Sequence, residues 1–139
     1  MDSIRRNIHL LADCGFRLAL DDYRGARINF PQCSTMPFSE IKVDSYLVDG
    51  VFRDHASQAI LESIRQYSIA NQQRLVVEGV TDSKDLLVLN DIGVDAYQGY
   101  LFCRPKPVRE LQRWMKVWRG RIIESETTEL PKQNASYFP

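Results

Sequence analysis

The chain has 139 residues, enough for one ordinary domain with a substantial core. Its 18 basic and 18 acidic side chains give a formal net charge of zero, so no overall field draws it to nucleic acid or to an acidic membrane surface. No apolar stretch has the length of a signal peptide or of a bilayer-spanning helix. We therefore expect small-molecule or protein partners, with neither nucleic acid nor a membrane as a partner.

The cysteines indicate a reducing compartment. Cys14, Cys33 and Cys103 are odd in number and far apart, without the close pairs that a structural zinc site requires. We interpret them as reduced thiols in a cytoplasmic protein.

The first element in the chain is an amphipathic helix. Ile4, Ile8 and Leu11 fall on one helical face, with Ser3 placed to cap the start and Gly15 the end. A strand is expected at 16–20, and the prolines and glycine of 23–37 predict an irregular segment. These residues form the first of several strand and helix alternations.

The second strand, 40–44, alternates cleanly. Ile41 and Val43 fall on one face, so Lys42 points away from the aliphatic side. A longer helix is expected at about 54–71, because apolar residues recur there at helical spacing: Ala56, Ile60, Ile64 and Tyr67.

The second half repeats the alternation. A β-branched run predicts a strand at 75–80, followed by a helix that Ser83 can cap and Gly93 can end. Another strand is expected at 94–102. Pro105 and Pro107 then open a last helix, whose expected buried stripe is Val108, Leu111, Met115 and Trp118. From about Gly120 the periodicity is lost, which predicts a flexible tail.

Four alternations of strand and helix predict an α/β fold built from parallel βα units. The carboxyl ends of such strands meet on one rim, where functional groups gather. Here those ends carry Asp21 and Asp22, then Lys42, Glu78 and Gln98. Adjacent carboxylates repel each other unless a cation lies between them, so the pair favours a metal site.

Two readings without a metal stay open at this rim. The two aspartates are compatible with a solvated turn at the end of a strand. Alternatively Arg24 and Arg27, which lie close in the sequence, neutralise the pair in place of a metal ion.

At these residues the sequence resembles the second half of an EAL domain, the bacterial module that cleaves cyclic di-GMP. The family runs LALDDFGTG, IKID, AEGVE and QGYLFSRP. This chain has, in the same order and at similar spacings, Leu18-Ala19-Leu20-Asp21-Asp22-Tyr23, Ile41-Lys42-Val43-Asp44, Val77-Glu78-Gly79-Val80 and Gln98-Gly99-Tyr100-Leu101-Phe102-Cys103-Arg104-Pro105. The resemblance spans Ile4 to about Trp118. It implies a TIM-like barrel of about twice this length for a complete domain.

The resemblance also implies roles for the rim residues. Asp21 and Asp22 would be ligands of two metal ions, Mg²⁺ or Mn²⁺, which need hard oxygen donors. Lys42 would hold the attacking water or stabilise phosphate charge. Glu78 would help bind the metal-activated water, and Gln98 would orient water or ligand. Together they would support metal-assisted hydrolysis of a phosphodiester.

Three departures from the family pattern affect these roles. The signature Glu-Ala-Leu strand and two further metal ligands are absent, because the chain begins after them. The loop FGTG is replaced by Tyr23-Arg24-Gly25-Ala26, and the second glutamate of EGVE is Thr81. We therefore expect the chain alone not to hydrolyse the nucleotide.

We interpret residues 1–119 as a partial EAL-like βα domain and 120–139 as the flexible tail. A half barrel leaves two unpaired strand edges and an apolar inner face, which favours completion by dimerisation or by a protein partner.

Three functional hypotheses follow. The first is a degenerate, truncated regulator in cyclic di-GMP signalling that binds a protein partner, with or without the nucleotide. The second is a phosphodiesterase whose site a second chain completes. The third is a folded remnant without a site. We rank them in that order, because the rim residues are retained while part of the metal shell is absent.

Overall fold

The computed structural model describes residues 2–24, 33 and 35–118. The chain forms two compact units, residues 1–104 and 105–139, which are described separately. Within the described part of the chain, no helix has the length and apolar character needed to cross a membrane. The expected flexible tail at 120–139 and most of the expected irregular segment at 23–37 lie outside the described residues.

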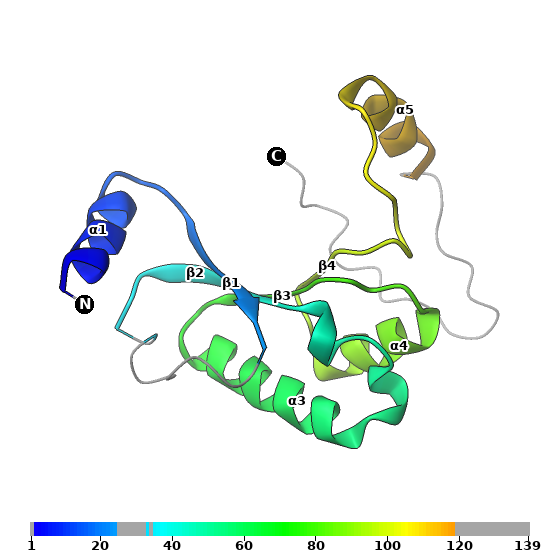
Figure 1. The fold of residues 1–139 in the computed structure, drawn as a ribbon, viewed down its shortest axis with the longest axis horizontal. Coiled ribbons are helices and arrows are strands. Elements are labelled where there is room, and N and C mark those ends of the chain that lie inside the picture. The colour runs from blue at the N-terminus through cyan, green and yellow to red at the C-terminus, as the bar shows by residue number, and fades with distance from the viewer. Residues whose placement is uncertain (1, 25–32, 34, 119–139) are drawn as a thin grey trace. The chain divides into compact units, whose positions relative to one another are not determined.

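A parallel sheet forms the centre of the first unit (Figure 1). It contains four strands in the order β1-β2-β3-β4, each parallel to its neighbour. The strands are β1 Leu18–Tyr23, β2 Phe38–Val43, β3 Arg74–Val77 and β4 Ala96–Tyr97. Helices and short 3-10 turns connect and flank them: α1 Asp2–Asp13, η1 Ser45–Leu47, η2 Val51–Arg53, α3 His55–Ala70 and α4 Ser83–Ile92. The predicted α/β fold of alternating βα units is confirmed.

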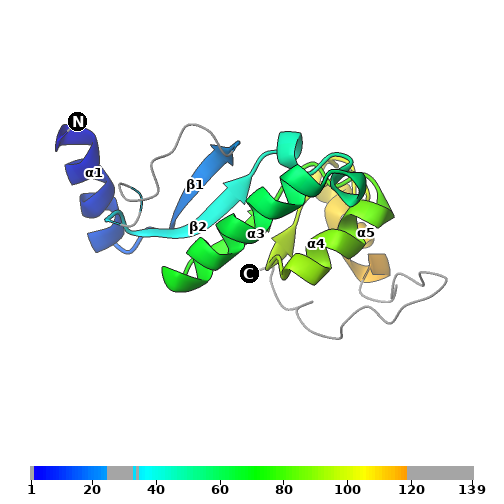
Figure 2. The ribbon, with the colours of Figure 1, turned by 90° about the horizontal axis from the view of Figure 1, so that it is seen from below.

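The core lies between the sheet and the layer formed by α3 and α4 (Figure 2). Ile41 and Val43 of β2 are buried, as the alternation of that strand predicts. They belong to one apolar cluster with residues of β3, α3 and α4: Leu75, Val77, Leu61, Ile64, Leu86 and Leu89. Because side chains alternate along a strand, Glu40 and Lys42 lie on the opposite, uncovered face of the sheet.

Buried Asp85 joins α4 to the loop that precedes α3. Its carboxylate accepts hydrogen bonds from the backbone N–H groups of Gly50, at 3.1 Å, and Phe52, at 3.0 Å. Asp85 is 1% exposed. A buried acceptor that satisfies two backbone donors fixes the path of this loop.

Three local expectations about the helices were wrong. Helix α1 begins at Asp2, so Ser3 lies inside the helix and does not cap it. The N-cap of α4 is Asp82, which accepts from the Lys84 N–H. Helix α3 buries Ile64 as expected, but one turn earlier it buries Leu61 in place of Ile60, which is 39% exposed. Its N-cap Asp54 accepts from the backbone N–H groups of Ala56 and Ser57.

Strand β4 has two residues, far fewer than the predicted strand at 94–102. After Tyr97 the backbone bends toward the segment that follows β3. Val80 N–H donates to the Gln98 carbonyl at 3.0 Å, and Leu101 N–H donates to the Val80 carbonyl at 3.0 Å. These bonds take the place of a longer ladder, so the QGYLF segment is a turn.

The second unit contains helix α5, Val108–Trp118. Pro107 precedes it, and its carbonyl accepts from Glu110 N–H at 2.9 Å, as expected for a helix opened by proline. The expected burial of the apolar stripe was wrong at two positions, because Val108 is 80% exposed and Leu111 is 40% exposed.

The three cysteines are free thiols, as expected. Cys33 is buried, which raises the pKa of its thiol, whereas Cys14 is exposed.

Candidate functional site

The two adjacent aspartates lie in a bulge at the end of β1. Leu20 is paired with Ile41, and Tyr23 is paired with Val43, so Asp21 and Asp22 together oppose Lys42. A bulge inserts an extra residue into one strand and changes the direction of its side chains. Asp22 adopts a φ of 58°, in the left-handed region that aspartate tolerates better than most residues. The bulge therefore separates two carboxylates that are neighbours in sequence.

Lys42 lies between two carboxylates from different strands. Its Nζ is 3.3 Å from Oδ1 of Asp21 and 2.5 Å from Oε1 of Glu78. The Lys42 and Glu78 side chains are only 23% and 24% exposed, so solvent screens this pair less than a surface ion pair. The hydrogen bond to Glu78 raises the pKa of Lys42, and the contact with Asp21 adds a smaller increase. Together these two contacts outweigh burial, which alone would lower the pKa. Lys42 is therefore a firmly held cation at the centre of the rim.

The second aspartate contacts a different cation. Arg24 donates through Nε to Oδ1 of Asp22 at 3.2 Å and through Nη2 to Oδ2 of Asp44 at 3.4 Å. Asp44 follows β2, and its carboxylate also accepts from the Tyr46 N–H at 2.9 Å. This backbone hydrogen bond, helped by Arg24, lowers the pKa of Asp44.

Arg24 thus neutralises Asp22, one member of the Asp21–Asp22 pair, as in the alternative without a metal. Arg27, the other arginine of that alternative, lies outside the described residues. Sequence reasoning assigned no role to Asp44. The available signal was its position at the carboxyl end of a strand: Asp44 directly follows β2, and Asp21 and Asp22 are near the end of β1.

Gln98 is brought beside the end of β3 by its backbone. Its N–H donates to the Val77 carbonyl at 2.8 Å, and its carbonyl accepts from Val80 N–H. The next residue, Gly99, permits this approach, because a Cβ there would overlap the backbone of Val80. Gly79, at a φ of 77°, packs equally closely on Ser45. These glycines place the exposed Gln98 on the same rim as Glu78.

The rim has the right donor chemistry for a hard cation but an incomplete donor set. Four carboxylates, Asp21, Asp22, Asp44 and Glu78, and two cations leave it with a formal charge of −2. Carboxylate oxygens suit Mg²⁺ or Mn²⁺. Yet across residues 2–24, 33 and 35–118, no three acidic, histidine or cysteine side chains are grouped as metal ligands. The described residues therefore form part of a metal shell at most.

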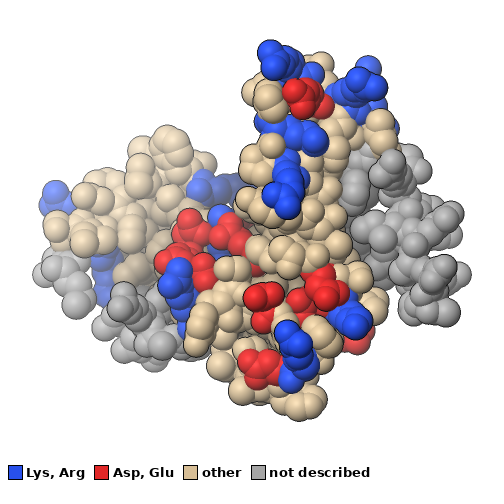
Figure 3. Space-filling model, turned by 45° about the vertical axis from the view of Figure 1, so that its right-hand side comes forward, with Lys and Arg blue, Asp and Glu red and all other residues tan. Residues whose placement is uncertain are grey.

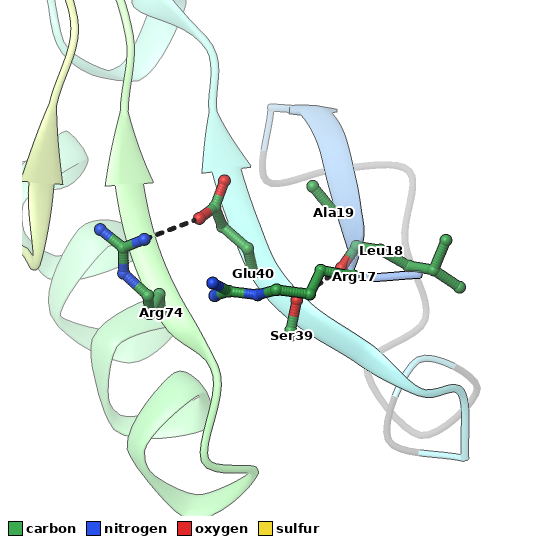
Figure 4. A pocket seen from close by; sticks show the side chains of 6 residues that line it. All are labelled: Arg17, Leu18, Ala19, Ser39, Glu40 and Arg74. Atoms are coloured by element: carbon green, nitrogen blue, oxygen red, sulfur yellow. Dashed lines mark hydrogen bonds and ion pairs between the residues drawn. The ribbon is translucent and has the colours of Figure 1, made fainter. Parts of the chain in front are cut away.

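The uncovered face of the sheet carries charged side chains beside apolar ones such as Val76, so the expectation of an apolar inner face holds only in part. At the amino ends of the strands, Arg74 Nη1 lies 3.4 Å from Oε2 of Glu40. These residues line a cleft of about 230 Å³ together with Arg17, Leu18, Ala19 and Ser39 (Figure 4). The alternation of β2 explains the difference, because Glu40 and Lys42 share the face opposite Ile41. This cleft lies at the other end of the strands from the rim.

The family model described as EAL domain matches residues 1–105 of this chain. That is more than half of its length. The chain belongs to the EAL domain family. The matched part of the EAL domain includes all four strands and every rim residue, while α5 lies beyond it.

Curated relatives of this EAL chain include phosphodiesterases. Cyclic di-GMP phosphodiesterase RocR of Pseudomonas aeruginosa is 34% identical over 101 residues, which cover 73% of this chain and 26% of RocR. Oxygen sensor protein DosP of Escherichia coli is 31% identical over 112 residues, which cover 81% of this chain and 14% of DosP. The chain therefore spans about a quarter or less of the length of these two relatives.

Solved EAL structures have the same fold. The Klebsiella pneumoniae protein BlrP1, in a complex with manganese and cyclic di-GMP, superposes with a TM-score of 0.68 at 30% identity. The match covers 75% of this chain and 26% of BlrP1. The first unit of this chain thus corresponds to part of the larger barrel in that structure. The EAL domain family acts in cyclic di-GMP signalling.

Proposed function

We propose that this chain is a degenerate regulatory EAL protein that acts in cyclic di-GMP signalling by binding a protein partner, and not by hydrolysis. One observation carries the proposal: the described carboxylates form part of a metal shell at most, because no three acidic, histidine or cysteine side chains are grouped as ligands among the described residues. Metal-assisted hydrolysis needs carboxylates that converge on the metal and leave room for a water molecule. Here a side-chain cation of the same chain takes that central place, and Arg24 does the same between Asp22 and Asp44.

The free edge of β1 supports a protein partner. Among the described strands β1 pairs only with β2, so its other edge offers backbone donors and acceptors to another chain. The charged groups on the uncovered face, such as Glu40 and Arg74, would have to be matched by a completing chain. A second copy or a separate protein that supplies the missing strands would satisfy both features.

The rim also supports nucleotide binding, provided that a divalent cation is present. Its formal charge of −2 repels the phosphates of cyclic di-GMP, so binding there requires a positive ion between them. Asp21 and Asp22 would hold Mg²⁺ or Mn²⁺, which supplies Lewis-acid charge. Lys42 and Gln98 would contact the phosphate or a water, and Glu78 would orient that water.

The alternative function is a phosphodiesterase whose site is completed by a second chain. The observation in its favour is that Asp21, Asp22, Lys42, Glu78 and Gln98 all lie at the carboxyl ends of adjacent parallel strands. A partner that adds further carboxylates would complete a metal shell around them. In this case Lys42 would have to leave the carboxylates on metal binding.

Light scattering on the purified chain tests partner binding. We expect a dimer, or a monomer that forms a complex when the amino-terminal half of an EAL domain is co-expressed with it. A monodisperse monomer that forms no complex, and whose β1 amides are protected from hydrogen exchange, would contradict the proposal. Titration of cyclic di-GMP with and without Mg²⁺ then shows whether the rim takes the nucleotide, and Asp21→Asn locates the binding.

A further inference from the structure

Arg24 distinguishes this chain from the EAL motif that surrounds it. The motif LALDDFGTG has a glycine directly after its aromatic residue, whereas this chain has Arg24 after Tyr23. Glycine has no side chain, so a domain with the family motif carries no cation at this position. The fold of the family therefore does not account for the contacts that Arg24 makes.

The guanidinium group of Arg24 joins two carboxylates, one from the bulge of β1 and one directly after β2. Its Nε lies 3.2 Å from Oδ1 of Asp22 and 3.4 Å from Oδ1 of Asp44. Its Nη2 lies 3.2 Å from the same Asp22 oxygen and 3.4 Å from Oδ2 of Asp44. The Nε and Nη2 edge thus faces both oxygens of Asp44, which is the forked arrangement in which arginine binds a carboxylate most strongly.

These two carboxylates need a cation between them. Both contact one guanidinium group, so they lie near each other, and like charges at such a distance repel. The Asp44 side chain is only 20% exposed, which limits the screening of this repulsion by water. Figure 3 shows charge pairing at the surface, with acidic side chains gathered near the middle of the view and basic side chains directly beside them.

The described rim residues fit one divalent ion better than the two that the EAL resemblance implies. Both contacts of Arg24 with Asp22 are to Oδ1, which leaves Oδ2 outside this ion pair. That oxygen lies on the residue next to Asp21, so the two aspartates can share one ion. A second ion bound by Asp22 and Asp44 would have to displace the guanidinium group.

We propose that Arg24 takes the place of one of the two divalent ions, so that the rim of this chain accepts at most one. The substitution keeps the charge and changes the chemistry. A guanidinium group neutralises carboxylates, but it holds its protons at every ordinary pH. A divalent ion lowers the pKa of a bound water, and a guanidinium group does not. The rim therefore keeps a cation for binding and loses one that would serve hydrolysis.

Counting bound Mn²⁺ tests this proposal without an activity assay. Free Mn²⁺ has a sharp electron paramagnetic resonance signal that is largely lost on binding, so a titration counts the ions bound to each chain. We expect Arg24→Gly, which restores the residue of the family motif, to bind one ion more than the unaltered chain. Asp22→Asn in the Arg24→Gly background should remove this additional ion. Equal counts with and without Arg24, or a gain that survives Asp22→Asn, would overturn the proposal.

Arg17→Gly is the matched control for charge. It removes the same charge and introduces the same residue, but Arg17 lines the cleft at the amino ends of the strands. We expect its Mn²⁺ count to equal that of the unaltered chain. A gain as large as that of Arg24→Gly would show that total charge, and not the position of Arg24, limits ion binding.

Arg24→Gln guards against a disturbed backbone as the cause, because it keeps a long side chain and removes only the charge. Circular dichroism checks that both variants at this position stay folded. We expect Arg24→Gln to bind the additional ion as well, since Asp22 and Asp44 lose their cation in both variants. A gain in Arg24→Gly alone would mean that space and not charge excludes the ion, which would contradict the proposal.

This inference rests on the proposed function only where that function places a divalent ion at the rim. Light scattering reports on partner binding, whereas the Mn²⁺ count reports on Arg24. A chain that forms complexes but shows equal counts with and without Arg24 would keep the proposed function and lose this inference. A chain that forms no complex but gains an ion in Arg24→Gly would do the reverse.

Discussion

The Nζ of Lys42 lies 2.5 Å from Oε1 of Glu78, across the boundary between β2 and β3. The same ammonium group is 3.3 Å from Oδ1 of Asp21 on β1. One cation therefore links the carboxyl ends of three neighbouring strands. This arrangement neutralises two carboxylates that the EAL resemblance assigns to metal and water binding, and it underlies the proposal of a regulatory role.

Lys42→Met should release these carboxylates. We expect a loss of about 2 kcal/mol in the free energy of unfolding, because the partly buried carboxylate of Glu78 and the exposed carboxylate of Asp21 lose their cation. Mn²⁺ should then stabilise the variant more than it stabilises the unaltered chain, since the metal binds where the ammonium group lay. Thermal unfolding with and without Mn²⁺ measures both effects. Lys84→Met, which removes an exposed lysine near Phe52, is the control. If Mn²⁺ stabilises Lys42→Met no more than the control, the carboxylates do not form the core of a metal site.

Asp54 should make the stability of α3 depend on pH. Hydrogen bonds from Ser57, together with the Ala56 N–H, lower the pKa of this carboxyl below its ordinary 3.8. A carboxyl whose pKa is lower in the folded state than in the unfolded state stabilises the fold at pH values above its unfolded-state pKa. This stabilisation is lost as the pH falls through the folded-state pKa. The melting temperature of Asp54→Ala should thus lie below that of the unaltered chain at neutral pH, with the difference shrinking below about pH 4. A constant difference down to pH 2 would show that the charge has no part in capping.

Asp85 should contribute to stability through its two buried hydrogen bonds. Asp85→Ala leaves the N–H groups of Gly50 and Phe52 without this acceptor, so we expect a loss of about 3 kcal/mol. Asp91→Ala, on the exposed side of the same helix, should change stability by less than about 0.5 kcal/mol. Urea unfolding compares the two variants. Similar midpoints would mean that the loop does not depend on Asp85.

Gly99→Ala should disturb the turn that carries Gln98. A Cβ at this position would overlap the Val80 backbone, which cannot move without breaking its bonds to Gln98 and Leu101. We expect a loss of about 3 kcal/mol in the free energy of unfolding. Gln98→Ala, which shortens the exposed neighbouring side chain, should leave stability almost unchanged. Equal unfolding curves for the two variants would show that the turn relaxes freely.

The sequence allowed prediction of the features that depend on local pattern. The aliphatic runs around Ile41 and Leu75 alternate or cluster as buried strands do, so the parallel sheet followed from them. The gathering of Asp21, Lys42 and Glu78 also followed, because parallel strands end on a common rim.

Features that depend on pairing between distant residues could not be predicted in this way. The bulge at Asp21 and Asp22 exists only in relation to the register of β2. The contact of Arg24 with Asp44 joins residues 20 positions apart. Cap assignment failed for a local reason, since Asp82 and Ser83 are both good caps and adjacent in the sequence.

The most direct test of the proposed regulatory role is an assay for cyclic di-GMP hydrolysis by the purified chain with Mn²⁺ or Mg²⁺. The Asp21→Asn variant is assayed beside it to identify contaminating activity. If Lys42 and Arg24 neutralise the carboxylates in place of a metal, the chain alone should form no more linear product than Asp21→Asn does. Metal-dependent product formation that Asp21→Asn abolishes would contradict the regulatory account and establish the chain as a phosphodiesterase.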